Sequence, residues 1–220
     1  MSVRSGRSSG AREPLNPAQY IACMKKRTQT GFTLYELLIT LLIVGVVLSV
    51  GIPNLAEFTR NGRITASAND LHASFLMARS EAARAKTNIT ICASDDGLDC
   101  GGWWDDGYIV FVDTDGSITV NNAGETILRT HGPAEEGVSL AVENGATYFS
   151  YASTGMGRGN VGGNPAISRV IFCDQRGTQE TSQDQSAARL FVATPMGRAT
   201  IVRDYNTVTT ALGLMGQNCP

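Results

Sequence analysis

An uncharged apolar run near the amino end constrains this chain more than any other feature. From Leu37 to Ile52 the sequence reads LLITLLIVGVVLSVGI and carries no charged residue. Counted from Phe32, the segment has 21 residues. A helix of that length, rising about 1.5 Å per residue, crosses a hydrocarbon core of roughly 30 Å. The run therefore predicts a membrane-spanning helix.

Glu36 is a charged residue directly before this uncharged run. A carboxylate inside such a segment is disfavoured by at least about 2.5 kcal/mol on insertion scales, so it indicates a partner charge or a functional demand. The alternative is that Glu36, four residues beyond Phe32, reaches the headgroups by snorkelling. Directly before Phe32 stand a basic stretch (25–27), a polar stretch (28–30) and Gly31.

This arrangement resembles the type IV prepilin signal. In that family a prepilin peptidase cleaves after the glycine, and the new amino-terminal phenylalanine is N-methylated. The resemblance implies cleavage between Gly31 and Phe32 and N-methylation of Phe32. It also implies that Glu36 acts in assembly by neutralising the amine of a neighbouring subunit, since a buried charge is tolerable with a partner. Pro53 lies where helices of this family commonly bend.

The amino end has other interpretations. An ordinary secretory signal has an apolar core of about 7 to 15 residues and a small-residue cleavage site, and this run is longer and lacks that site. A permanent single-pass anchor remains open. Met24 begins the peptide MKKRTQTG, a leader of ordinary length for the family, so translation from Met24 is an alternative start.

Basic residues set the expected orientation. Six of them precede the span: Arg4, Arg7, Arg12, Lys25, Lys26 and Arg27. We therefore expect a single pass through a bacterial inner membrane, with the amino end in the cytoplasm and the rest in the periplasm. The expected divisions are a leader (1–31), a membrane or filament-core helix (32–53), an amphipathic helical half (54–85) and a β-rich domain (86–220).

Apolar residues after Pro53 recur at helical steps of three and four. They are Phe58, Ile64, Ala68, Leu71, Phe75, Ala78, Ala82 and Ala85. One helix over about 32–85 is predicted, its second half covering a sheet. His72 lies beside this stripe and is expected to be a helix-face residue rather than a ligand.

From Thr87 onward, short β-branched and aromatic runs alternate with turn residues. The predicted strands are 88–93, 108–112, 117–120, 126–129, 138–142, 147–152, 167–173, 189–193 and 199–203. Strands gathered after one long helix favour an antiparallel sheet packed on that helix, an α+β fold.

Four cysteines follow the span: Cys92, Cys100, Cys173 and Cys219. An even count outside the cytoplasm predicts two disulfides, for which three pairings exist. Proximity favours Cys92 with Cys100, which leaves Cys173 with Cys219. A zinc site is disfavoured because no close C-x-x-C spacing occurs and the chain has two histidines.

Several motifs narrow the resemblance to the GspH/FimT family of minor pilins and pseudopilins. They are ICASDDG (91–97) with Cys100, Trp103, GYIVFVD (107–113), Phe149 with Gly155, Cys173, and Gly197-Arg198 before the last cysteine. The resemblance implies a subunit of a type IV pilus or a type II secretion pseudopilus. Its implied partners are prepilin peptidase, other pilins or pseudopilins and the inner-membrane assembly platform.

Catalysis and cofactors are not expected. The chain has no Ser-His or Cys-His constellation, and its aspartate-rich segments fit turns. The sequence DTDG (113–116) resembles a calcium loop only superficially, because an EF-hand needs glycine at its sixth position and glutamate at its twelfth. A hairpin turn is favoured there, and no cofactor or metal is predicted.

Charge is distributed unevenly along the chain. Residues 86–143 hold 2 basic and 11 acidic residues, whereas 144–220 hold 6 arginines and 4 acidic residues. Some FimT-like members capture DNA through a carboxyl-terminal Gly-Arg-x-Arg motif, of which this chain keeps Gly197 and Arg198 but has Thr200 at the last place. DNA binding by Arg198 and Arg203 in natural transformation is the alternative role, although their odd spacing along a strand sends them to opposite faces.

Overall fold

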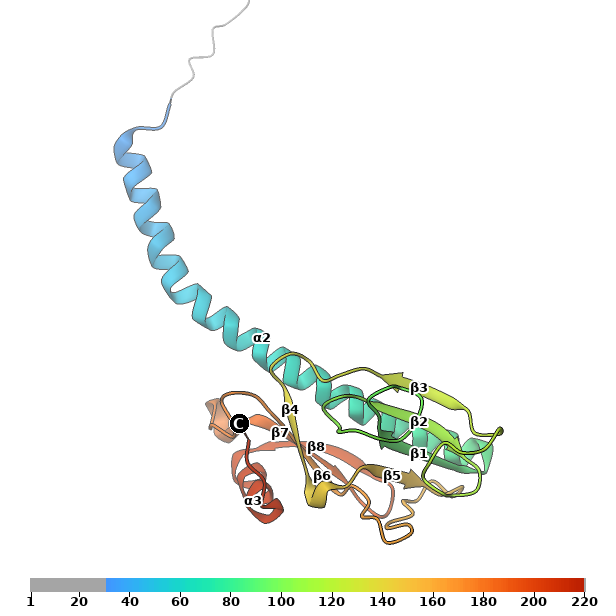
Figure 1. Cartoon of the computed structure of the whole chain (residues 1–220). Coiled ribbons are helices and arrows are strands. Elements are labelled where there is room, and N and C mark those ends of the chain that lie inside the picture. Colours follow the sequence, from blue (N-terminus) through green and yellow to red (C-terminus); the bar gives the residue numbers. More distant parts are fainter. Residues whose placement is uncertain (1–30, 220) are drawn as a thin grey trace, which may run out of the picture. The chain divides into compact units, whose positions relative to one another are not determined.

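A computed structural model describes residues 31–219 of the chain (Figure 1). The expected leader before Gly31, the alternative start at Met24 and the basic residues before the span lie outside the described residues. The chain divides into two compact units, one up to Val50 and one from Gly51 onward. Helix α2 (Leu34–Ala85) has 52 residues and contains Pro53. It begins two residues after Phe32 and ends at the predicted Ala85.

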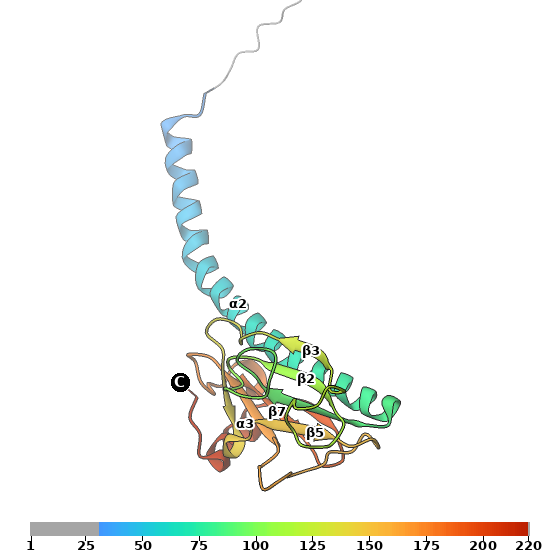
Figure 2. The same cartoon turned by 45° about the vertical axis from the view of Figure 1, so that its right-hand side comes forward.

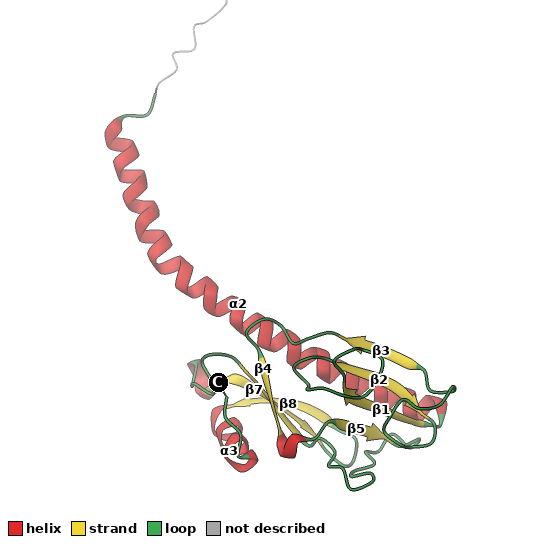
Figure 3. Cartoon of the chain, in the orientation of Figure 1, coloured by secondary structure: helices red, strands yellow, loops and turns green. Residues whose placement is uncertain are grey.

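Eight strands follow α2 in the described part of the chain (Figure 3). They are β1 (Asn88–Ala93), β2 (Tyr108–Asp113), β3 (Ile127–His131), β4 (Ser139–Val142), β5 (Tyr148–Tyr151), β6 (Arg169–Cys173), β7 (Gln185–Ala193) and β8 (Ala199–Asp204). Short 3-10 turns lie at Glu143–Gly145 and Ser182–Asp184, and helix α3 (Tyr205–Met215) follows β8.

The strands form two antiparallel sheets rather than a single one. Their orders are β3-β2-β1-β5 and β4-β6-β7-β8. The α+β class with antiparallel strands after one long helix is confirmed. The division follows from the pairing, because β5 adds to the edge of β1, whereas β4 pairs with the later strand β6.

The second half of α2 provides the centre of the core in the unit that begins at Gly51. Its buried apolar side chains are Ile64, Ala68, Leu71, Phe75, Ala78 and Ala82, and they cluster with side chains from both sheets. The Phe75 ring centroid lies 5.1 Å from that of Phe149 in β5 and 4.7 Å from that of Phe191 in β7. One helical face therefore joins the two sheets. Phe58 and Ala85, at the ends of the predicted stripe, are exposed, which corrects that prediction.

Other segments cover the opposite sheet faces. Helix α3 packs Val208, Ala211 and Met215 on a cluster from β6 and β7 that includes Ile171 and Leu190. In Figure 2, α3 and the green part of α2 lie on different sides of the second sheet. On the first sheet, Ile118 and Val161 belong to long connections and pack against β1, β2 and β5.

The predicted strand at 117–120 is wrong. Asp115 Oδ1 accepts the Ser117 N–H at 2.9 Å, and Asp113 Oδ2 accepts the Ile118 N–H at 3.3 Å. These side chains take backbone donors that a sheet would use, so the segment turns. Ile118 accordingly has a positive φ of 63°.

Helix α3 has no counterpart in the sequence predictions. Asp204 caps it by accepting the Thr207 N–H at 2.8 Å, and Gly216 ends it with φ 61°. An Asp cap and a terminal glycine around Val208, Ala211 and Met215 were usable signals. The threonines and valine between them favour a strand by propensity, and burial on the sheet overrides that preference.

Candidate functional site

The predicted cleavage junction lies outside the helix and is open to solvent. Gly31, Phe32 and Thr33 precede the first helical residue, Leu34. The Phe32 side chain is 86 % exposed, and a Cβ added at Gly31 would meet no atom within 4 Å. Nothing in the described part of the chain therefore shields the Gly31–Phe32 peptide bond.

Glu36 closes a capping box on the first turn of α2. The N–H and hydroxyl groups of Thr33 donate to Glu36 Oε2 at 3.0 and 3.1 Å, and the Glu36 N–H donates to Thr33 Oγ1 at 3.2 Å. This reciprocal pattern satisfies N–H groups that the start of a helix leaves free. The sequence reasoning missed Thr33, although Thr-x-x-Glu before an apolar run is the signature of a capping box.

The first unit presents an apolar helix surface on every side. All residues from Gly31 to Val50 are exposed, and Glu36 is the only charged residue among them. Among the described residues, α2 contains the one stretch long and apolar enough to cross a membrane. Contiguous apolar surface of this extent is unfavourable in water. The first unit is therefore suited to a lipid or protein environment.

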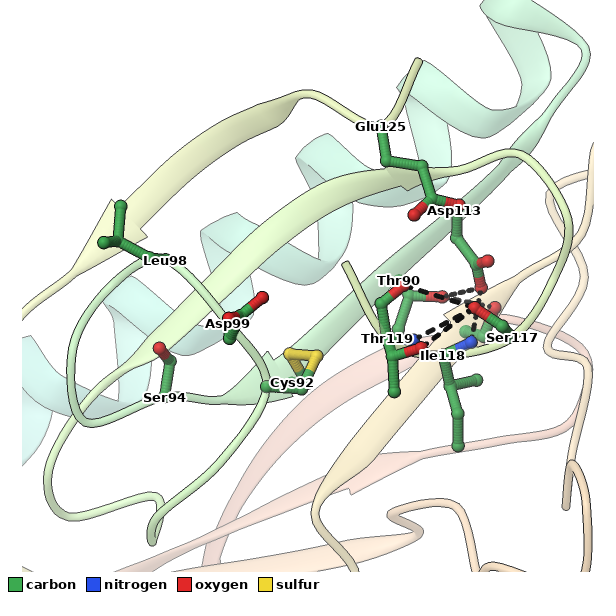
Figure 4. Close-up of a disulfide and its surroundings, with 12 residues drawn as sticks. Thr90, Cys92, Ser94, Leu98, Asp99, Asp113, Ser117, Ile118, Thr119 and Glu125 are labelled. Atoms are coloured by element: carbon green, nitrogen blue, oxygen red, sulfur yellow. Dashed lines mark hydrogen bonds between the residues drawn. A yellow bond between two sulfur atoms is a disulfide. The ribbon is translucent and has the colours of Figure 1, made fainter. Parts of the chain in front are cut away.

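Two disulfides fasten the second unit. Cys92 in β1 bonds Cys100 with a Cα–Cα distance of 5.5 Å, and Figure 4 shows this disulfide with its surroundings. Cys173 in β6 bonds Cys219 with a Cα–Cα distance of 5.6 Å. The second bridge ties the segment after α3 to the sheet that α3 covers. This pairing is the one that proximity along the chain favours.

Most of the six carboxyl-terminal arginines are already engaged. Ion pairs join Arg158 to Asp113 (3.3 Å), Arg169 to Glu143 (2.7 Å) and Arg176 to Asp174 (2.7 Å). Arg189 is 3 % exposed and donates to the carbonyl groups of residues 186–188. Among the described residues, Arg198 and Arg203 are the two of this set that are exposed and outside any ion pair.

Arg198 and Arg203 lie near opposite ends of β8. Arg198 precedes β8 and Arg203 lies near its other end, so a rise of about 3.3 Å per residue separates them by about 16 Å. Arg203 instead lines a polar cavity of about 420 Å³ with Arg176 and Arg189. Burial, together with the charges of Arg203 and Arg176, lowers the pKa of Arg189 to about 10.

Gly197 has a structural role beside Arg198. It adopts a φ of 75° in the turn before β8, and a Cβ there would collide with the Gly155 carbonyl oxygen. Another residue would strain this turn. Backbone packing thus explains the glycine of the Gly-Arg pair, without any role in DNA binding.

Two protein families match the chain. Residues 26–52 match the prokaryotic N-terminal methylation motif, and residues 67–195 match the family described as type II transport protein GspH. The second match covers more than half of the chain. The chain belongs to the GspH family. The resemblance that the sequence motifs indicated is therefore confirmed for both the amino-terminal segment and the β-rich domain.

Solved structures of minor subunits are similar to this GspH-family chain. The Pseudomonas aeruginosa type IV minor pilin FimU is 21 % identical, with 66 % of this chain and 92 % of FimU covered and a TM-score of 0.44. The minor pseudopilin EpsH from the type 2 secretion system of Vibrio cholerae is 13 % identical, with 64 % and 97 % covered and a TM-score of 0.40. No curated protein matches the chain.

The GspH match and the methylation motif together cover the features that define the class. The motif includes Gly31, Phe32 and Glu36, and the GspH region contains strands β1 to β7. The GspH-family protein is accordingly a minor pilin or pseudopilin of the type IV pilus and type II secretion class. Strand β8, helix α3 and Cys219 lie beyond the matched region.

Proposed function

We propose that prepilin peptidase cleaves this protein between Gly31 and Phe32, and that the mature subunit then enters a type IV pilus or a type II secretion pseudopilus. Phe32 becomes the N-methylated amino terminus. The carboxylate of Glu36 pairs with the amine of a neighbouring pilin or pseudopilin. As a minor subunit working with the inner-membrane assembly platform, the protein primes the fibre.

The exposed apolar part of α2, up to Val50, is the main support for this proposal. It bears a single carboxylate, four residues from the bond to be cut, and is otherwise apolar or uncharged through Val50. A helix of this kind is stable in the bilayer core and equally so against similar helices in a filament. A new amine at Phe32 would supply the partner that a carboxylate in such surroundings needs.

Two features favour a periplasmic domain. Six basic residues lie in the short segment before the span, which favours a cytoplasmic amino end. Both cysteine pairs are bonded, and disulfides persist in oxidising compartments. The segment 32–53 would thus span the inner membrane before assembly, with the domain over 86–220 outside it.

Processing in membranes tests the proposal. The full chain is expressed with and without prepilin peptidase, and the intact mass and amino-terminal sequence of the product are measured. We expect a product that begins at Phe32 and carries one added methyl group. Gly31→Val should leave the leader attached, because the peptidase reads the glycine at the cleaved bond.

Gly45→Ala is the matched control. Gly45 lies in the same exposed helix, and a Cβ there meets nothing within 4 Å, so this variant should be processed like the unchanged chain. An uncleaved product in the presence of the peptidase, or equal cleavage of Gly31→Val, contradicts the proposal.

A further inference from the structure

Three carboxylates meet where β2 ends. Asp113 is the last residue of β2, Asp115 follows it, and Glu125 comes just before β3. One carboxylate oxygen from each residue lies within 4.8 Å of the other two. Asp113 and Glu125 are 0 % and 8 % exposed, and Figure 4 shows their side chains beside each other. Asp115 lies at the solvent side of the cluster.

One oxygen of Asp113 is left without a partner. Asp113 Oδ2 accepts hydrogen bonds from Thr90 Oγ1 at 2.7 Å, the Ile118 N–H at 3.3 Å and Arg158 Nη1 at 3.3 Å. Oδ1 is buried and has no hydrogen-bond partner among the described residues. A buried carboxylate oxygen is costly unless a donor or a cation satisfies it. The free oxygen therefore points to a ligand within the cluster.

We propose that Asp113, Asp115 and Glu125 bind one Ca²⁺ ion. The three carboxylates bring three negative charges, and Arg158 brings one positive charge through its ion pair with Asp113. The remaining charge of two is balanced by one divalent cation. Asp113 Oδ1 supplies the buried ligand, and the open side at Asp115 leaves room for water to complete the coordination shell.

Ligand type favours a hard divalent cation such as Ca²⁺ over zinc. All three groups are carboxylates, the hard oxygen donors that Ca²⁺ and Mg²⁺ prefer, whereas zinc prefers nitrogen and sulfur. Two ligands at about 2.4 Å from one Ca²⁺ ion lie up to about 4.8 Å apart, but ligands of Mg²⁺ at about 2.1 Å lie at most about 4.2 Å apart. The three carboxylate oxygens lie within 4.8 Å of one another, so a single Ca²⁺ ion can reach all of them.

Hydrogen bonds from the β2–β3 connection hold Glu125 in place. Glu125 Oε1 accepts the N–H of Thr114, and Oε2 accepts the N–H groups of Asn121 and Asn122 at 2.9 and 3.1 Å. Burial raises the pKa of Glu125, but the hydrogen bonds from Asn121 and Asn122 together lower it by more, so the pKa lies below its ordinary value. The Glu125 carboxylate is thus oriented before the ion arrives.

The Asp115 side chain is similarly prepared. Its Oδ1 accepts the Ser117 N–H at 2.9 Å, and its Oδ2 accepts Asn122 Nδ2 at 2.7 Å. The Ser117 N–H is the main cause that lowers the pKa of Asp115. The spacing of this ligand set differs from an EF-hand, because the glutamate is the thirteenth residue counted from Asp113. The folded β2–β3 connection, rather than a helix-loop-helix motif, brings Glu125 to the site.

Calcium at this position would join three separate segments. Asp113 belongs to β2, Glu125 to the end of the connection, and Arg158 reaches in from the loop after β5, where it also donates to the Gly116 carbonyl at 3.1 Å. The ion would therefore stabilise the outer side of the first sheet against local opening.

Calorimetric titration and thermal unfolding of the full chain in detergent test the site, with CaCl₂ as the probe and MgCl₂ as the comparison. We expect one Ca²⁺ per chain, with a Kd in the range of about 0.1 to 1 mM seen for extracellular modules. The midpoint of unfolding should rise by about 3 to 6 °C when Ca²⁺ is at about ten times its Kd.

Asp115→Asn is the decisive variant, because Asp115 is exposed and its loss leaves the core intact. It should weaken Ca²⁺ binding by at least about tenfold, since affinity follows ligand charge. Asp99→Asn, an exposed aspartate in the connection after β1, is the matched control and should bind like the unchanged chain. A loop held by hydrogen bonds alone would show no Ca²⁺ response at about 5 mM. That result, or undiminished binding by Asp115→Asn, overturns the proposal.

Discussion

The Thr33 N–H and hydroxyl groups lie 3.0 and 3.1 Å from Glu36 Oε2, so the carboxylate proposed to bind a neighbouring subunit already caps its own helix. Cleavage after Gly31 would retain both groups of Thr33, because the new amino terminus is Phe32. The same carboxylate thus has an intramolecular role before assembly and a proposed intermolecular role after it.

Two substitutions of Glu36 separate these roles. Glu36→Gln keeps a side chain that serves in a capping box but removes the charge, whereas Glu36→Ala removes both. If Glu36 neutralises an amine, we expect both variants to lose incorporation into the fibre while processing continues. The measurement is the amount of subunit in purified fibres, with Glu57→Gln as the control. Normal incorporation of Glu36→Gln would limit Glu36 to capping.

The two disulfides are expected to contribute unequally to stability. Cys92 and Cys173 are both buried, but the bridges close loops of 8 and 46 residues. In the chain-entropy account the longer loop restricts the unfolded chain more, by about 1.5 kcal/mol. Removing Cys173–Cys219 by paired serine substitutions should therefore lower the free energy of unfolding more than removing Cys92–Cys100. Urea unfolding measures both, and equal losses would contradict the expectation.

Tyr108 makes stability depend on alkaline pH. Burial raises its pKa to about 12, although the hydrogen bond with Ser74, 3.0 Å between oxygens, lowers it in part. The unfolded chain loses this proton near pH 10, so the stabilisation is complete below about pH 10 and is lost as pH rises toward 12. Tyr108→Phe should remove that part of the loss.

Urea unfolding between pH 7 and 11.5 checks the Tyr108 prediction. Tyr35, which is 72 % exposed, provides the control variant Tyr35→Phe. That variant should keep the pH dependence of the unchanged chain. A Tyr108→Phe variant with the same alkaline loss as the unchanged chain would assign the loss to other groups.

DNA binding stays a prediction, and the ion pairs limit the number of arginines that are free to bind phosphate. Only Arg198 and Arg203 of the six arginines in 144–220 are exposed and outside ion pairs in the described chain. The logarithm of the binding constant falls with the logarithm of salt concentration, with a slope of about −0.9 for each neutralised phosphate. Two arginines therefore predict a slope of about −1.8. Titration with duplex DNA at several salt concentrations measures this slope, and Arg198→Ala should halve it. Arg84→Ala, which removes an arginine paired with Glu81, is the control.

A slope much steeper than about −2 would show that paired arginines leave their carboxylates to bind phosphate. Absence of binding at low salt would exclude the DNA role for this chain. Either result bears on the arginines alone and leaves the proposed fibre function untouched.

Much of the fold was predictable because its signals are local. Apolar spacing predicted the helix to Ala85, and alternating β-branched runs predicted eight of the observed strands. The prediction failed where side chains compete with the backbone, as Asp113 and Asp115 do at 117–120, and where packing overrides propensity, as in α3. The capping role of Thr33 was also readable locally, from the spacing Thr-x-x-Glu before an apolar run.

The sequence by itself determined the processing signal, the apolar helix and the α+β class, because each depends on neighbours within a few turns of chain. Only the tertiary structure decided how strands divide into two sheets and which charges are free. Arg158 is neutralised by Asp113 across 45 residues, and Glu125 reaches the aspartates through a folded connection. Electrostatic energy depends on distances in space, and spacing along a chain does not contain them.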